Sequence, residues 1–104
     1  MFIRIARFEG TDPSQVDESI ERVRTMWDEG ATPPGLEDCR RSMMLVDRQS
    51  GTGLGVTFFD DEDAMRRGDQ ALNEMTPPAG AGGSRSSVEM YEVALDREWT
   101  PSVR

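Results

Sequence analysis

Apolar and polar residues alternate in four stretches of the chain, and this pattern predicts four β-strands. Residues 2–8 and 53–59 carry apolar side chains on both faces, so we expect both of these strands to be covered on two sides. Residues 36–48 and 88–95 show the same two-residue period and predict the other two strands. The turn-forming residues 49–53 separate the second strand from the third and predict a hairpin.

Apolar residues at steps of three and four predict a first helix between the first two strands. Asp12 is the expected N-cap, and Pro13 fits the first helical position because its fixed φ suits a helix start. Gly30 is the expected end of the helix. The apolar stripe of this helix consists of Val16, Ile20, Val23 and Trp27. Trp27 either closes the end of the core or stacks on a flat ligand.

A second helix is predicted to begin within the acidic residues 60–63. Asp60 or Asp61 is the expected cap, since a carboxylate accepts hydrogen bonds from the free N–H groups of a first helical turn. Consecutive acids point in different directions around a helix, so we favour this interpretation over a magnesium or calcium site. Small residues dominate the apolar stripe, which lets the helix lie close to a sheet: Ala64, Gly68, Ala71, Leu72 and Met75. Residues 76–87, rich in Gly, Pro, Ala and Ser, predict a connection to the last strand.

This order of elements predicts a ferredoxin-like α+β fold, βαββαβ, with two helices on one face of a four-stranded antiparallel sheet. Residues 1–95 are expected to form the single domain and residues 96–104 a tail, whose Trp99 docks on its own core or on a second subunit. The face opposite the helices is apolar in this interpretation and is assigned Phe2, Ala6, Phe8, Met44, Val46, Thr57 and Phe59. A second copy of the sheet would cover it, which predicts a two-fold homodimer.

Composition narrows the possible functions. The 104 residues include 12 basic and 20 acidic side chains, and the net charge of −8 argues against nucleic acid or an anionic membrane surface as a partner. Cys39 is the single cysteine, which excludes an intrachain disulfide and predicts a cytoplasmic protein. Every basic residue is Arg, and no His is present. Catalytic triads built on His, His-ligated metals and Lys Schiff bases are therefore excluded.

Three stretches carry a resemblance to a known group: FIRIARF at residues 2–8, GVTFFDDEDA at residues 55–64 and VEMYEV at residues 88–93. With the order of elements, they resemble the dimeric α+β barrel superfamily, and within it the antibiotic-biosynthesis-monooxygenase-like domains. The resemblance covers residues 1–95. It implies a pocket between sheet and helices, in a group that includes cofactor-independent oxygenases of aromatic polyketides, haem-degrading enzymes and small isomerases.

The chain departs from two branches of that group. The haem-degrading branch uses a His iron ligand with Asn and Trp nearby, whereas this chain has no His, its only Asn is Asn73 and its second helix contains no Trp. Haem degradation is therefore not expected, and we expect no cofactor. The aromatic oxygenases are associated with Asn and Trp near the start of the second helix, where this chain has Asp60, Asp61 and Met65.

Two functions remain open. The first is a cofactor-independent monooxygenase or isomerase acting on an aromatic or apolar substrate, which would bind Trp27, Met43, Phe58 and Met65. In that enzyme Tyr91 or Arg40 would polarise a substrate oxygen, and Glu92 would be the base. Pairing of Arg40 with an acid and methionine as core filler are the structural alternatives. The second function is a non-catalytic homodimeric module that binds a ligand or a protein and has a filled core.

Overall fold

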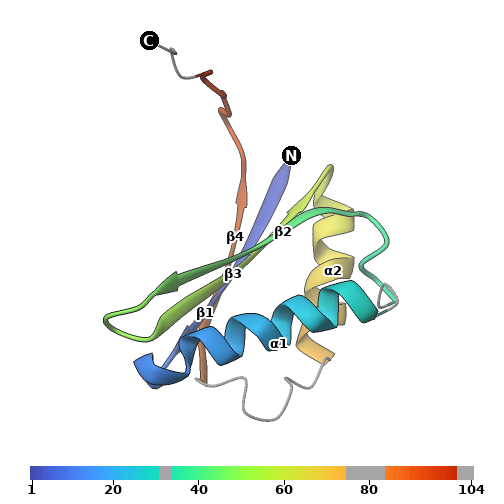
Figure 1. Ribbon diagram of the computed structural model, residues 1–104. Coiled ribbons are helices and arrows are strands. Elements are labelled where there is room, and N and C mark those ends of the chain that lie inside the picture. The colour runs from blue at the N-terminus through green and yellow to red at the C-terminus, as the bar shows by residue number, and fades with distance from the viewer. Residues whose placement is uncertain (31–33, 75–83, 101–104) are drawn as a thin grey trace.

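The computed structural model describes residues 1–30, 34–74 and 84–100. Its elements are β1 (Phe2–Glu9), the 3-10 helix η1 (Pro13–Gln15), α1 (Val16–Glu29), β2 (Cys39–Asp47), β3 (Thr52–Phe59), α2 (Glu62–Glu74) and β4 (Ser84–Glu92) (Figure 1). The strands form one antiparallel sheet in the order β2-β3-β1-β4. The predicted ferredoxin-like α+β fold is confirmed.

The predicted cap Asp12 lies at the start of η1, and a predicted cap also begins α2. The carboxylate of Asp12 accepts a hydrogen bond of 2.9 Å from the backbone N–H of Ser14, and η1 leads directly into α1. Of the two acids proposed to cap α2, Asp61 accepts a hydrogen bond of 2.7 Å from the N–H of Ala64. Asp60 instead pairs with Arg40 on the neighbouring strand β2. The acidic stretch is therefore used in capping and ion pairing.

The β2–β3 hairpin depends on one glycine. Gly51 has a φ of +75°, which places it in the left-handed region, and its N–H bonds the carbonyl of Asp47 at 2.9 Å. A Cβ at this position would lie 1.8 Å from the carbonyl oxygen of Thr11. Only glycine fits where the hairpin meets the segment that leads into η1. An ion pair between Arg48 and Asp17 also joins the hairpin to α1.

The core lies between α2 and the sheet. Phe59 has no exposed surface and packs with Ala64 and Met65. Gly68 brings the helix so close to the sheet that a Cβ there would lie 2.3 Å from Cζ of Phe59. The small side chains of the α2 stripe thus allow close packing, as predicted. Three half-buried side chains complete this cluster: Phe2, Leu36 and Cys39.

Two strands, β2 and β4, differ from the prediction in their bounds. β4 begins at Ser84 and ends at Glu92, whereas the alternation predicted residues 88–95. Residues 84–87, predicted as part of a connection, pair with the end of β1, because backbone hydrogen bonds form without regard to small polar side chains. The rest of that predicted connection, residues 76–83, lies outside the described residues. β2 begins at Cys39, and residues 36–38 belong to the turn before it.

The predicted faces of the sheet were exchanged. The side assigned to the dimer contact is the one that α2 covers, since Phe59 lies in the core and Arg4 bonds α2. The strand register places the other set of side chains together on the uncovered side, here called the open face: Ile3, Ile5, Met43, Leu45, Leu54, Val56, Phe58 and Tyr91. The pattern could not choose between two apolar faces. The open face is nevertheless largely apolar, although Arg7, Arg41 and Glu89 also lie on it.

The segment after β4 runs away from the rest of the molecule (Figure 1). The N–H of Val93 donates to the carbonyl of Met1 at 2.8 Å, and beyond this bond the chain leaves the sheet. Leu95 is 95% exposed and Trp99 is 72% exposed. Of the two predicted docking places for Trp99, its own core is therefore excluded. Among the described residues, none of the helices has the length and apolar character needed to cross a membrane.

Candidate functional site

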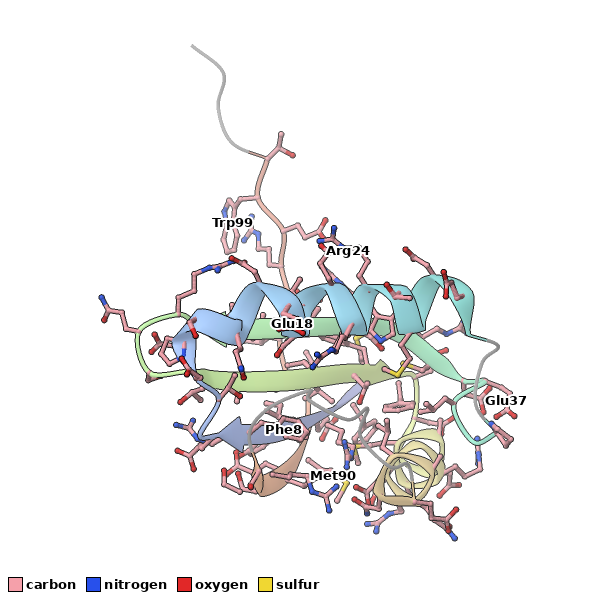
Figure 2. All side chains as sticks on the ribbon, turned by 60° about the horizontal axis from the view of Figure 1, so that its bottom comes forward. Phe8, Glu18, Arg24, Glu37, Met90 and Trp99 are labelled. Carbon is pink, nitrogen blue, oxygen red and sulfur yellow. The ribbon has the colours of Figure 1, made fainter. Side chains whose placement is uncertain are left out.

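A pocket of about 600 Å³ lies on the helix-covered side of the sheet, beside the last turn of α1. Its floor is formed by β1 and β3, where Gly55 leaves room because it has no side chain. Its apolar wall is formed by Phe8, Met26, Trp27 and Leu36. Glu37 also lines the pocket. Figure 2 shows that Glu37 lies well apart from Phe8.

The sequence of α1 explains why the pocket lies at its C-terminal end. Val16 and Ser19, near the start of the helix, are buried. Ile20 and Val23 are half-buried, and Trp27 is 50% exposed. The apolar stripe therefore passes from the core to the wall of the pocket along the helix. Of the two predicted roles for Trp27, closing the core does not fit this exposure.

Two arginines of the pocket lining, Arg4 and Arg85, belong to a cluster of polar side chains. Arg4 is only 3% exposed, and its Nε–H donates to Asp69 Oδ1 at 2.7 Å. One Nη of Arg4 donates to Asn73 Oδ1 at 3.2 Å, and Nη1 of Arg85 donates to the same oxygen at 2.7 Å. Two guanidinium groups thus meet at one neutral amide oxygen, with one carboxylate beside them.

Sequence reasoning missed this cluster. Asp69 and Asn73 are four residues apart, so both lie on the face of α2 that turns towards Arg4. An arginine in the middle of an apolar strand requires such partners, and this requirement is the signal that could have found them. Arg85 was missed because residues 84–87 were predicted to be a connection.

Thr57 lies opposite Arg4 on β3 and also lines the pocket. Its hydroxyl oxygen is buried and has no hydrogen-bond partner among the described residues. A buried hydroxyl without a partner costs about 1–3 kcal/mol. The floor of the pocket therefore contains a hydroxyl without a hydrogen-bond partner, on the residue opposite Arg4.

The predicted site residues are not gathered at one place. Trp27 and Arg40 line the pocket, whereas Met65 is buried in the core. Met43 and Phe58 lie on the open face, because their positions in β2 and β3 turn them away from the helices. The predicted pocket of Trp27, Met43, Phe58 and Met65 is therefore not formed as one cavity within the chain.

The three predicted catalytic side chains also lie apart. Arg40 bonds Asp60 at 2.7 Å, and this hydrogen bond raises the pKa of the Arg40 guanidinium further. Tyr91 lies on the open face, where its hydroxyl donates to Glu89 at 2.9 Å, and this bond raises the pKa of Tyr91. Glu92 is exposed at the end of β4. Of the three, only Arg40 lines the pocket.

Metal chemistry has no built site in the described part of the chain. There, no three or more Cys, Asp or Glu side chains are grouped as metal ligands. The thiol in the pocket, Cys39 Sγ, lies 3.4 Å from the carbonyl oxygen of Arg41 and 3.5 Å from Ser42 Oγ. Within the acidic stretch, Asp61 caps α2, and Asp60 and Glu62 form ion pairs with Arg40 and Arg66.

Comparison with solved structures identifies the fold. MhuD, a heme-degrading protein of Mycobacterium tuberculosis, has a TM-score of 0.64 at 13% identity, over 94% of this chain and 100% of that chain. A variant of SnoaB, a cofactor-independent oxygenase from Streptomyces nogalater, has a TM-score of 0.54 at 14% identity, covering 91% and 94%. A dimeric ferredoxin-like protein from an uncultured marine organism has a TM-score of 0.55 at 9% identity, covering 97% and 92%.

Solved structures with this fold also include antibiotic biosynthesis monooxygenases. The resemblance to antibiotic-biosynthesis-monooxygenase-like domains is therefore confirmed for the fold, and at these sequence identities it concerns the fold alone. No protein-family model matches the chain, and no curated protein matches its sequence.

Haem is the cofactor to consider for this pocket, because MhuD, which has a similar fold, degrades heme. Haem iron in proteins is held by His, Cys, Met or Tyr. This chain has no His, and its single Tyr lies on the open face. Among the described residues, the pocket lining therefore offers haem iron only the thiol of Cys39 and the thioether of Met26, and no imidazole.

Proposed function

We propose that this chain is the subunit of a homodimer that binds a small apolar or aromatic molecule between its sheet and α1. The pocket of about 600 Å³ carries the proposal. That volume falls within the roughly 300–1,000 Å³ typical of ligand sites. Its wall offers an indole ring, a phenyl ring and a thioether, which suit a flat apolar ligand.

Trp27 is the side chain on which such a ligand would stack. The indole is half exposed at the edge of the pocket. A ligand that covered this apolar surface would remove it from water, which is favourable. A stacked ring contributes about 0.5–1.5 kcal/mol beyond the area that it buries. Binding would therefore cover Trp27 without a change in the core around Phe59.

Calorimetric titration with 2-naphthalenemethanol, a flat neutral probe, tests this function. We expect saturable binding to the full chain and a loss of about three- to tenfold in affinity for Trp27→Ala. Gln70→Ala, a change on the exposed side of α2, is the control and should leave the affinity unchanged. Absence of binding, or equal binding by Trp27→Ala, would overturn the proposed ligand site.

The homodimer is proposed from the open face and the tail. Leu45 and Tyr91 on that face are 41% and 50% exposed, and most of the apolar side chains around them are half-buried. A two-fold contact between identical sheets would cover both copies at once. The exposed Leu95 and Trp99 of the tail would then pack on the second subunit.

Sedimentation velocity measures the predicted association. We expect a dimer at micromolar concentration. Leu45→Glu should raise its dissociation constant by more than about tenfold, equivalent to about 1.4 kcal/mol. Gln70→Glu, on the exposed side of α2, adds the same charge and serves as the control. A stable monomer of the unaltered chain would contradict the dimer.

Catalysis is the second candidate, as a cofactor-independent monooxygenase or isomerase, and one observation favours it. Arg40 lines the pocket, where its guanidinium could polarise a substrate oxygen. Tyr91 and Glu92 keep only the roles proposed from the sequence. Oxygen uptake or isomerisation with a planar phenol, abolished in folded Arg40→Ala, would favour an enzyme. Binding without turnover would favour the non-catalytic module.

We also propose that the protein is cytoplasmic, because its single cysteine cannot form an intrachain disulfide and therefore fits a reducing compartment.

A further inference from the structure

Positive charge is concentrated around the pocket of an otherwise acidic chain. The net charge of the whole chain is −8. Among the residues that the structure describes, however, the pocket is lined by Arg4, Arg40 and Arg85 and by a single acid, Glu37. A fourth arginine of the lining, Arg41, has its guanidinium 5.8 Å from the ring of Phe58, a residue of the open face. An acidic protein that places arginines at a ligand site favours an anion there.

Only one of the three guanidinium groups lacks an acid. Arg4 is paired with Asp69, and Arg40 is paired with Asp60. Arg85 donates to the neutral amide of Asn73, and among the residues that the structure describes it forms no ion pair. Asn73 Oδ1 also accepts from Arg4 and joins the two arginines in one cluster. With two guanidinium groups, one carboxylate and one neutral amide, the cluster of Arg4, Asp69, Asn73 and Arg85 carries one positive charge in excess.

The excess charge lies beside the apolar wall. Arg85 is the cross-strand neighbour of Phe8, which lines the pocket, and both the Arg85 and Asn73 side chains are exposed. Glu37 is located at the other end, before β2, apart from Phe8 (Figure 2). The end of a ligand that lies against Phe8 would therefore meet the guanidinium of Arg85, apart from Glu37.

We propose that the ligand of this pocket is an apolar or aromatic monoanion whose carboxylate binds Arg85 at the Arg4–Asp69–Asn73 cluster. One unpaired guanidinium matches one negative charge, and its planar fork suits a carboxylate. A doubly charged phosphate would leave a charge uncompensated beside an apolar wall. This inference rests on the proposed ligand site and adds the charge and the chemical group of the ligand.

Two probes with the same ring system separate the two proposals. Calorimetric titration of the full chain compares 2-naphthoate with neutral 2-naphthalenemethanol. We expect 2-naphthoate to bind about tenfold more tightly, the effect of one charge-assisted hydrogen bond. The preference should weaken as ionic strength rises, because salt screens an accessible charge pair.

Substitutions in the cluster assign the preference to Arg85. Arg85→Gln should lower the affinity for 2-naphthoate to that for 2-naphthalenemethanol and should leave the affinity for 2-naphthalenemethanol unchanged. Asn73→Asp should do the same, because it places a carboxylate of nearly the same shape beside Arg85 and supplies an internal counter-ion. Arg24→Gln is the matched control, since Arg24 lies on the side of α1 remote from Phe8 and pairs with Glu21 (Figure 2). It should retain the full preference.

Each outcome decides one proposal. If both probes bind the unaltered chain equally, the anion inference is overturned and the proposed aromatic site stands. If the preference persists in both Arg85→Gln and Asn73→Asp, the carboxylate does not bind at this cluster and the inference is wrong. If neither probe binds, the proposed ligand site fails and the inference fails with it.

Discussion

The two helices of this fold differ in how they meet the same sheet. α2 carries Ala64 and Gly68 towards the strands and approaches until its backbone is in contact with the ring of Phe59. α1 begins with buried residues but ends with Met26 and Trp27 beside an open pocket. The small residues of α2 close the space between that helix and the sheet. The large residues at the end of α1 line a pocket that stays open.

This difference separates stability from binding within one small domain. Truncating a side chain that fills space in the core lowers the free energy of unfolding in proportion to the buried surface and the contacts that are lost. A side chain at the edge of a pocket has already lost part of those contacts in the free protein. The α2 half should therefore be sensitive to changes in stability, and the α1 half should be sensitive to changes in ligand affinity.

The largest expected effect comes from truncating one aromatic residue in each half. Phe59→Ala should lower the free energy of unfolding by about 3–5 kcal/mol, because a fully buried ring is replaced by a cavity. Trp27→Ala should lower it by less than about 1 kcal/mol, since half of the indole is already exposed. Urea unfolding followed by circular dichroism measures both. Equal losses would mean that the end of α1 belongs to the core and that the comparison fails.

Adding a single methyl group to α2 should also destabilise the protein. At an exposed helix position Gly→Ala gains about 0.8–1 kcal/mol of helix propensity. At Gly68 the new Cβ would lie 2.3 Å and 2.6 Å from two ring carbons of Phe59, so we expect a net loss of about 1–3 kcal/mol. Gln70→Ala in the same helix is exposed and should change stability by less than about 0.5 kcal/mol. A stabilised Gly68→Ala would show that α2 can move away from the sheet.

Much of the fold could be predicted because its local signals agree. The caps at Asp12 and Asp61, the hairpin at Gly51 and the small residues of α2 each specify one element, and together they specify the order of elements. The face of the sheet that the helices cover was predicted wrongly. β1 carries Phe2 and Phe8 on one side and Ile3 and Ile5 on the other, so alternation cannot decide between them.

The candidate site was predicted less well, for a physical reason. Trp27 and Arg40 were found because each stands out in its own element. Arg85 and Asn73 are brought together only by the pairing of β4 with β1 and by the position of α2 over them, which no short stretch of sequence encodes. A face error moves every residue of a strand at once, and this is why Met43 and Phe58 were assigned to the pocket.

Thr57 offers a smaller test, at the boundary between the two halves. Thr57→Val replaces a buried hydroxyl without a partner by a methyl group of similar shape, so we expect a gain of about 1 kcal/mol in the free energy of unfolding. Thr57→Ser keeps the hydroxyl and should show no gain. Thermal unfolding monitored by circular dichroism compares the three proteins. A destabilised Thr57→Val would indicate that the hydroxyl is already satisfied in solution.

The smallest expected effect is the titration of Tyr91, which reports on the open face. Tyr91 is the only tyrosine, so ultraviolet absorbance follows its ionisation alone. Its hydrogen bond to Glu89 raises the pKa of Tyr91 above the ordinary value, and Glu89→Gln should return the midpoint towards that value. A raised pKa in the folded state stabilises the protein below the unfolded-state pKa, and this contribution is lost as the pH rises through the folded-state pKa.

The same titration tests whether the open face becomes an interface. Contact with a second sheet would remove Tyr91 from water, and burial disfavours the phenolate and raises its pKa further. The midpoint of the unaltered chain should therefore rise with protein concentration, and that of Leu45→Glu should not. A midpoint independent of concentration in a chain that sediments as a dimer would show that the dimer forms through another surface, because Tyr91 would then remain exposed in both states.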